Sequence, residues 1–109
     1  MKRYEGQREG YVVIVTVNGR RLNPRQDLWN HSPTGFEWGY SGSGPAQLAL
    51  AILADHLGND EQAFNLYHRF KWAVVAEFPH RSWTLTGAEI EATLQKFREQ
   101  EPLLESMAG

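Results

Sequence analysis

The chain of 109 residues contains no cysteine. This absence excludes a disulfide framework and a thiolate nucleophile. A domain of this length buries roughly two thirds of the surface of its unfolded chain, so it needs neither disulfides nor a metal ion for stability. We therefore expect one domain over residues 1–109, with residues 103–109 forming a tail that frays.

Long apolar runs are also missing. Residues 11–15 and residues 48–54 are apolar runs, and both are far too short to cross a bilayer. The first thirty residues hold no apolar core of the kind that a secretory signal contains. We expect a soluble, cytoplasmic protein with no membrane partner.

The formal charge of −2 at pH 7 is unevenly divided along the chain. Residues 1–30 carry six Lys and Arg against three Asp and Glu, whereas residues 31–109 carry five against ten. A surface polarised in this way suits a protein partner. Net acidity disfavours general nucleic-acid binding, which depends on cations that neutralise phosphates, but it does not exclude it.

The first strand signal is YVVIVTV, residues 11–17, in which nearly every side chain is β-branched or apolar. Such a run is typical of a central strand that is covered on both faces. Asn18-Gly19 follows directly, and this pair accepts the two positive φ angles of a type I′ turn. The chain should therefore return as a hairpin that sets Val15 opposite Leu22.

A second hairpin is predicted from LWNHSPTGFEWGY, residues 28–40, around a four-residue turn over residues 32–35. This register pairs Trp29 with Trp38. One face of the hairpin would then hold Asp27, Trp29, His31, Phe36, Trp38 and Tyr40. An aromatic face of this kind most often packs beneath helices as core, whereas an exposed one would form a stacking platform for bases.

The stretch GSGPAQLALAILADHLG, residues 42–58, predicts a buried helix. Pro45 suits the first helical position, with Gly44 as the cap and Gln47 reaching back to the N–H of the cap. Residues 48–54 leave no polar face across two turns, which indicates a helix surrounded by the rest of the fold. The last glycine of the stretch should end the helix in the left-handed conformation.

Two amphipathic helices should follow. Asn59 with Gln62 predicts the start of a helix over residues 60–78, which must end before a proline. Thr86 and Glu89 have the spacing of a capping box and predict the start of another helix. The period of its apolar residues buries Ile90, Leu94 and Phe97.

Residues 82–85 add a short strand, and Pro102 should end the last helix. The predicted fold is an α+β domain. Its antiparallel sheet has about three to five strands, which include the two N-terminal hairpins, and packs against the buried Ala/Leu helix and the two amphipathic helices.

The segment HSPTGFEWGYSGSGPAQLALAILADHLG, extended by LYHRFKWAVV, resembles a small uncharacterised bacterial family with members on phages, plasmids and other mobile elements. Its signature is HSPTGFEWGYxGSGPAQLALAIL, and the similarity runs from residues 4–6 through residues 83–85. The family has no established activity, so the resemblance implies no catalytic residues. It implies a mobile-element setting, in which small proteins often bind and block host machinery.

The glycine and serine loop before the buried helix offers backbone N–H groups and a positive helix end, which together can hold an anion. It lacks the lysine of a P-loop and the spacing of a dinucleotide site. The competing interpretation is a tight turn in which glycines allow close packing. The histidines share no metal-ligand spacing and no nucleophile elbow is present, so we expect no metal, no cofactor and no catalytic residue.

Glu37 lies between two glycines on its strand face, which leaves its backbone open to a partner. It could form the polar centre of a recognition groove. The alternative is a cross-strand ion pair with Arg20, Arg21 or Arg25.

Three functional hypotheses follow. The first is a non-enzymatic binding protein of a mobile element, acting as an inhibitor or accessory factor on a host protein such as a defence complex. The second is a site for a nucleotide or phosphate compound at the GSGP loop, and the third is an uncharacterised enzyme. A second copy of the chain is a further candidate partner. The candidate binding residues are His31, Ser32, Thr34, Glu37, Trp38, Tyr40, Ser41, Ser43, Gly44 and Gln47.

Overall fold

A four-stranded antiparallel sheet has helices packed against one of its faces. The computed structural model describes residues 2–108, with side chains over residues 2–100. The sheet order is β3-β2-β1-β4. Its strands are β1 (Arg3–Glu9), β2 (Val12–Val17), β3 (Arg20–Arg21) and β4 (Ser82–Thr86). The helices are α1 (Ser43–Leu57), α2 (Asp60–Ala73), the short 3₁₀ helix η1 (Val75–Glu77) and α3 (Gly87–Ala108). The predicted α+β class is confirmed.

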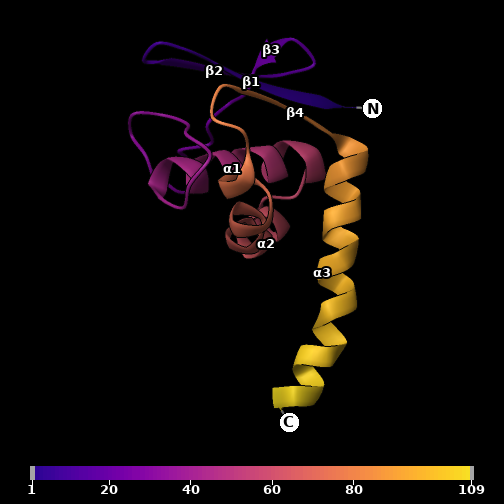
Figure 1. The fold of residues 1–109 in the computed structure, drawn as a ribbon. Coiled ribbons are helices and arrows are strands. Elements are labelled where there is room, and N and C mark those ends of the chain that lie inside the picture. The colour runs from indigo at the N-terminus through magenta and orange to yellow at the C-terminus, as the bar shows by residue number, and fades with distance from the viewer. Residues whose placement is uncertain (1, 109) are drawn as a thin grey trace.

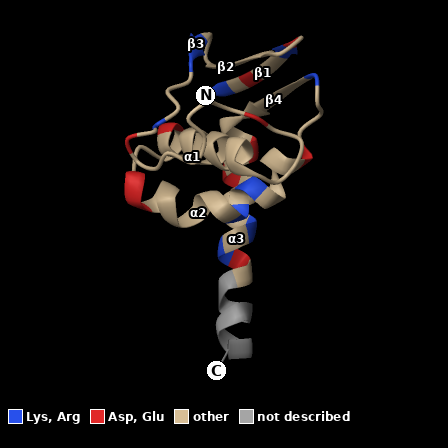
Figure 2. Cartoon of the chain, turned by 90° about the vertical axis from the view of Figure 1, so that its left-hand side faces the viewer, with Lys and Arg blue, Asp and Glu red and all other residues tan. Residues whose placement is uncertain are grey.

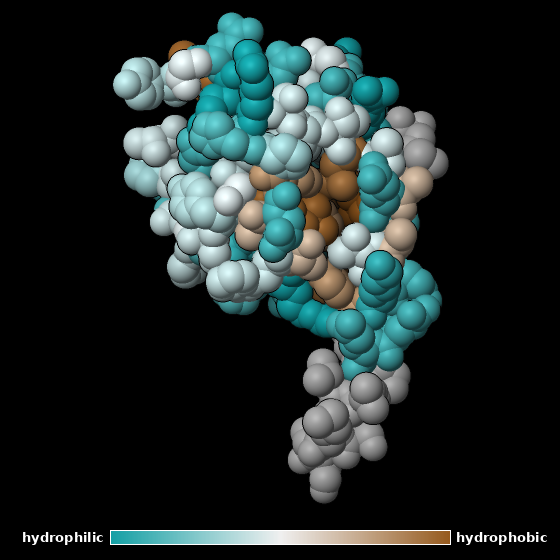
Figure 3. Space-filling view, in the orientation of Figure 1, coloured by the Kyte–Doolittle hydropathy of each residue, from teal (hydrophilic) through white to brown (hydrophobic). Residues whose placement is uncertain are grey.

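Figure 1 shows how the layers are arranged. The helix α1 runs beneath the sheet, α2 packs on the far side of α1, and α3 descends along one side and projects away from the body. Figure 3 shows apolar residues in a hollow between the body and α3. No helix in the described part of the chain combines the length and the apolar character that a membrane span requires.

The strand β1 was not predicted, yet it lies at the centre of the sheet between β2 and β4. Its residue Tyr4 is fully buried opposite Val17 on one side and Leu85 on the other. The hydroxyl of Tyr4 donates to Oδ2 of Asp55 on α1 at 2.6 Å. Burial, followed by the bond and the charge of Asp55, raises the pKa of the Tyr4 hydroxyl far above its usual range. This contact fixes the sheet to α1.

The hairpin of β2 and β3 forms as predicted. Asn18 and Gly19 have φ angles of 49° and 82°, and the Leu22 N–H donates to the Val15 carbonyl at 3.0 Å. The expectation that β2 is covered on both faces is wrong. Val15 is buried against the helices, but Val12 is 60% exposed because helices cover only one face of the sheet.

The second hairpin, expected over residues 28–40, does not form. This segment is an irregular loop, although its turn is present, with the Gly35 N–H donating to the Ser32 carbonyl at 3.2 Å. Trp38 inserts into the core, where its indole N–H donates to the backbone carbonyls of Pro79 and His80. The aromatic face is therefore split, and Trp29 stays half exposed. Contacts made by single side chains replace a strand ladder in this loop.

The helix α1 forms the centre of the core, as predicted, and is buried from Gly44 to Ala54. It ends at Gly58, whose φ angle of 62° confirms the left-handed cap. The start differs from the prediction, because Gly42 and not Gly44 is the cap. Gln47 does not reach back to the cap, since its amide lies in the core and bonds to the preceding loop.

The remaining helices begin as predicted. The Asn59 side chain accepts from the Gln62 N–H at 3.0 Å, and Thr86 and Glu89 form the reciprocal bonds of a capping box. The stripe of α3 is confirmed by the burial of Ile90, Leu94 and Phe97. The helix α2 ends at Ala73, where η1 takes over, and not at residue 78.

The C-terminal helix continues past its proline. The prediction that Pro102 ends α3 is wrong, because the helix runs to Ala108. A proline removes a single backbone N–H, and the turns on either side of it continue the helix. The prediction of a frayed tail over residues 103–109 concerns positions outside the described side chains.

Ion pairs join the basic residues of segment 1–30 to acidic residues that lie later in the chain. Lys2 Nζ lies 3.1 Å from Asp55 Oδ2, and Arg25 Nη2 lies 2.9 Å from Asp60 Oδ2. Figure 2 shows acidic residues at the start of α2 in the helical part of the molecule and basic residues on β3 in the sheet. These pairs hold the sheet and the loops to the helical layer.

Candidate anion-binding pocket

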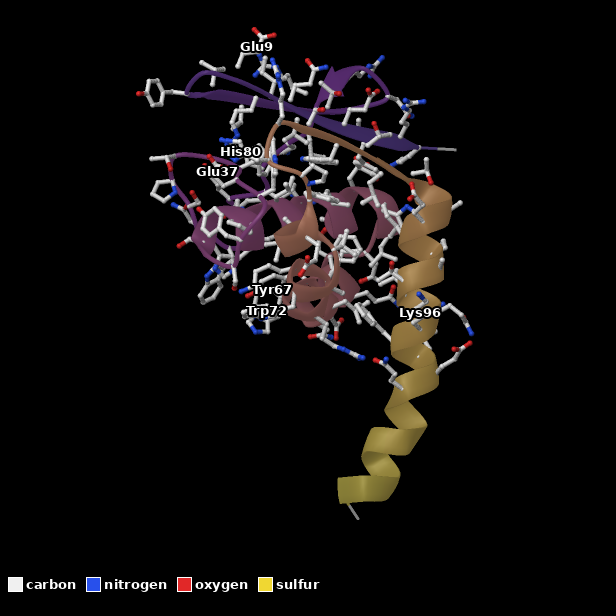
Figure 4. All side chains as sticks on the ribbon, in the orientation of Figure 1. Glu9, Glu37, Tyr67, Trp72, His80 and Lys96 are labelled. Carbon is white, nitrogen blue, oxygen red and sulfur yellow. The ribbon has the colours of Figure 1, made fainter. Side chains whose placement is uncertain are left out.

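A pocket of about 330 Å³ opens at the start of α1. Three segments build it: the loop before α1, the first turn of α1 and one face of α2. Its lining residues are His31, Gly42, Ser43, Ala46, Tyr67, His68 and Lys71, none of which is acidic. Figure 4 shows Tyr67, with Trp72 next to it, on the side of α2 that faces away from α3. We call this the α1 pocket.

The start of α1 has unused hydrogen-bond donors. The first N–H groups of a helix have no acceptor within it, and Gly42 supplies no side-chain cap. Pro45 has no N–H, and the Ala46 N–H is taken by the Gly42 carbonyl at 3.0 Å. The N–H groups of Ser43 and Gly44 are thus the donors left at this end. The first turn carries no acidic residue, so the positive end of the helix dipole is not neutralised there.

Lys71 is the most unusual residue of the α1 pocket. Its side chain is only 8% exposed, although lysine is almost never buried without a partner. No hydrogen bond or ion pair joins its ammonium to any residue in the described part of the chain. The ammonium lies 5.2 Å from the centroid of the Trp72 ring, a cation–π contact that does not neutralise its charge. Most of the Lys71 side chain is therefore buried, whereas its ammonium is not among the fully buried atoms without a partner and can reach the pocket without a counter-charge.

His31 supplies a second unsatisfied group. Its Nε2 atom is buried and has no hydrogen-bond partner in the structure. The ring packs between those of Trp29 and Tyr67, at centroid distances of 5.6 and 5.1 Å. Burial, and then the nearby Lys71 and His68, lower the pKa of His31, so its ring is neutral at pH 7. An anion that offsets the charge of Lys71 would favour protonation of this ring.

The contribution of α2 was missed in the sequence. The sequence predicted this helix only as an amphipathic one, and none of its residues is among the predicted binding residues. The face consists of Phe64, Tyr67, His68, Lys71 and Trp72. Their spacing of three and four residues places them on one side of a helix, which is the signal that could have found them. Aromatic and basic residues together on an otherwise amphipathic helix indicate a surface with a ligand.

The structure divides the ten predicted binding residues. His31 and Ser43 line the α1 pocket, and Gly44 lies in the helix turn beneath it. Tyr40 and Ser41 are exposed on the loop and do not line it. Thr34 borders a different groove, between the loop and β2, and its Oγ1 lies 3.3 Å from the Ser32 hydroxyl.

The other predicted binding residues hold the loop in place. The amide oxygen of Gln47 accepts from the backbone N–H groups of His31 and Ser32, and its nitrogen donates to the Pro24 carbonyl at 2.6 Å. Trp38 is core. The side chain of Gln47 thereby fixes the backbone of His31 at the edge of the α1 pocket.

Glu37 forms an ion pair with a basic residue, but this residue is not Arg20, Arg21 or Arg25, which the sequence predicted as partners. Its carboxylate accepts two N–H groups of Arg8 on β1, which was not expected to be a strand. The Arg8 guanidinium, ahead of the Trp38 backbone N–H, lowers the pKa of Glu37. Figure 4 shows Glu37 beside His80, between the sheet and α1. Glu37 therefore ties the loop to the sheet, and it does not line the α1 pocket.

Comparison with known proteins places the chain in a family. Residues 4–96 match the family of unknown function DUF6166, and the chain belongs to this family. No curated protein and no solved structure matches the chain. In the described part of the chain, no group of three or more His, Asp or Glu side chains could hold a metal ion.

Proposed function

We propose that this protein binds a small phosphate-bearing anion in the α1 pocket. This is the second of the hypotheses that the sequence suggested. The observation that carries it is Lys71, a residue that is only 8% exposed and whose ammonium has no counter-charge, in the same pocket as an uncapped helix start. A helix N-terminus alone binds anions weakly, and an added cation beside it strengthens the attraction.

The energetics favour a ligand here. Holding the Lys71 side chain in a largely buried position without a counter-charge costs stability, and an anion in the pocket would offset this cost. Phosphate offers several acceptor oxygens to the Lys71 ammonium, the Ser43 N–H and the Nε2 atom of His31. These donors belong to three separate segments, so one anion would satisfy groups that the fold leaves without acceptors.

The test is a titration of ¹⁵N-labelled protein with inorganic phosphate, followed by amide NMR. We expect the Gly42, Ser43 and Gly44 amides to shift, and chloride at equal ionic strength to leave them in place. Lys71→Met should abolish the shifts. The matched control is Lys96→Met, because Lys96 is exposed on α3, away from the pocket (Figure 4). Unchanged amide shifts at millimolar phosphate would rule the proposal out.

The preferred hypothesis from the sequence, a mobile-element protein that inhibits or assists a host protein, stays a prediction. The same holds for its phage or plasmid setting, for a homodimer, for nucleic-acid binding and for the third hypothesis, an uncharacterised enzyme. We favour the anion over a protein partner because Trp38, Gln47 and Glu37, which the partner surface was to use, hold the loop to the fold. Native mass spectrometry of freshly purified protein would detect a ligand that stays bound.

A further inference from the structure

Two exposed tryptophans flank the α1 pocket, Trp29 on the side of His31 and Trp72 on the side of Lys71. We propose that the anion bound there is the phosphate of a mononucleotide, and that one of these two indoles stacks on its base. This inference rests on the proposed function and extends it to a class of ligand.

The exposure of the two rings is large. Trp29 is 51% and Trp72 57% exposed, although indoles are among the side chains that gain most from burial. Trp72 makes no ring–ring contact with another aromatic side chain among the described residues, and more than half of its surface is exposed. Its one charged neighbour is the ammonium of Lys71, which lines the pocket.

Trp29 belongs to a continuous aromatic surface. Its ring lies 5.6 Å from that of His31 and 5.9 Å from that of Phe64, and Phe64 lies 5.8 Å from Tyr67. His31 and Tyr67 line the pocket. A nucleobase stacked on Trp29 would lie next to His31, which lines the pocket in which Lys71 would hold the phosphate.

The size and chemistry of the pocket suit a nucleotide better than a lone ion. Its volume of about 330 Å³ falls at the lower end of the range of small-molecule sites. A phosphate group next to open aromatic faces is the combination with which proteins hold nucleotides, since every base has a face that can stack. Lys71 lines the pocket and its ammonium also lies 5.2 Å from the centroid of the Trp72 ring, so the phosphate would bind close to this indole.

The charges near Trp29 favour a single nucleotide over a single-stranded nucleic acid as the ligand. Arg25 is the arginine nearest to Trp29 along the chain. It forms ion pairs with Asp27 and Asp60, with shortest N–O distances of 3.0 and 2.9 Å. The first turn of α2, which follows Asn59, carries Asp60 and Glu61, and Figure 2 shows these acidic residues at the start of α2. A second phosphate would therefore meet acids, and the net charge of −2 adds to the repulsion.

The experiment compares adenosine 5′-monophosphate, ribose 5-phosphate, adenosine and inorganic phosphate by calorimetry and amide NMR on the full chain. We expect the nucleotide to bind about tenfold or more tightly than ribose 5-phosphate, which is the gain typical of one stacked base. Trp29→Ala or Trp72→Ala should remove this gain and leave the binding of ribose 5-phosphate unchanged. Both side chains are largely exposed, so the variants should fold, and thermal melting checks this. Tyr11→Ala, which removes an exposed ring on the β1–β2 turn, is the matched control.

The outcomes separate the two proposals. Equal affinity for the nucleotide and ribose 5-phosphate, or a gain that survives both tryptophan variants, would refute the nucleotide and keep the anion site. A single-stranded oligonucleotide that binds much more tightly than the mononucleotide, with a steep salt dependence, would assign the surface to a nucleic acid instead. Phosphotyrosine binding more tightly than the nucleotide would also overturn the assignment. If no phosphate compound binds, the proposal of an anion site is itself refuted.

Discussion

Arg8 binds Glu37 through both terminal nitrogens of its guanidinium, with Nη1–Oε2 and Nη2–Oε1 distances of 2.9 and 2.6 Å. The same guanidinium lies 4.8 Å above the Trp38 ring, and its Nε donates to the His80 carbonyl. One side chain from β1 thus holds the loop before α1 and the segment before β4. The loop that carries His31 to the α1 pocket depends on this pair.

Replacement of Glu37 by Gln should destabilise the fold. It leaves Arg8, whose side chain is 12% exposed, without its counter-charge, while Glu37 itself is 35% exposed and partly screened by water. We expect a loss of about 1–2 kcal/mol at pH 7 in denaturant unfolding. The control is Glu9→Gln at the exposed end of β1, which should be neutral (Figure 4).

The effect of Glu37→Gln should depend on pH. Because Arg8 lowers the pKa of Glu37, the carboxylate contributes its full stability above the usual pKa of glutamate. That stability is lost as the pH falls through the lower pKa of the folded state. The difference between wild type and variant should therefore shrink at pH 3, and a difference that does not change with pH would contradict the ion pair.

Replacement of Lys71 by Met should stabilise the protein while it removes ligand binding. Methionine fills a similar volume and leaves no unpaired charge in the 8%-exposed position. We expect a gain of about 0.5–2 kcal/mol in the free energy of unfolding, the range found when a functional residue is replaced by one that suits the fold. A variant less stable than wild type would show that Lys71 has a structural partner.

Gly44 should tolerate no side chain, whereas Gly42 should accept one. A Cβ atom on Gly44 would meet the Cβ and backbone nitrogen of Glu37, which the Arg8 pair holds in place. Gly44→Ala should cost about 1–3 kcal/mol by overpacking. A Cβ on Gly42 would meet only the ring of Tyr40, which is exposed and can move, and the backbone there is extended. Thermal melts of both variants test this contrast, and equal melting temperatures would contradict it.

Short-range signals in the sequence predicted the turns and caps correctly. The Asn18-Gly19 turn, the Asn59 cap and the Thr86 capping box each join residues at most three positions apart, so their chemistry is complete in the local sequence. The buried helix was predictable for the same reason, since its run of Ala and Leu leaves no polar face.

Long-range contacts account for what the sequence did not reveal. The strand β1 contains Gly6, which lowers its strand signal, but the glycine makes room for the ring of Trp83 on β4. The segment 28–40 has the period of a strand, but Trp38 and the side chain of Gln47 bond to distant backbone instead. The α1 pocket could not be predicted for a similar reason, because no local sequence pattern indicates that Lys71 lacks a partner.

The ionisation of His31 should couple stability and ligand binding to pH. Burial is the first cause that lowers its pKa, followed by Lys71 and His68 on α2, so the unfolded chain binds a proton at a higher pH than the folded one. Stability should therefore be constant above the usual histidine pKa and fall as the pH drops below it. His31→Gln should remove this loss in unfolding experiments between pH 7 and about 5, where glutamate is still ionised.

A bound anion should reverse this shift, because it offsets the charge of Lys71 and accepts a hydrogen bond from the imidazolium. NMR titration of the His31 ring should give a pKa below the usual histidine value in the free protein and a higher one with sulfate, whose charge is constant over this range. By linkage, sulfate should then bind more tightly as the pH falls through the pKa of His31, and His31→Gln should make binding independent of pH there. A pKa of His31 that does not move when sulfate saturates the protein would place the anion away from Nε2 and leave that buried nitrogen unsatisfied.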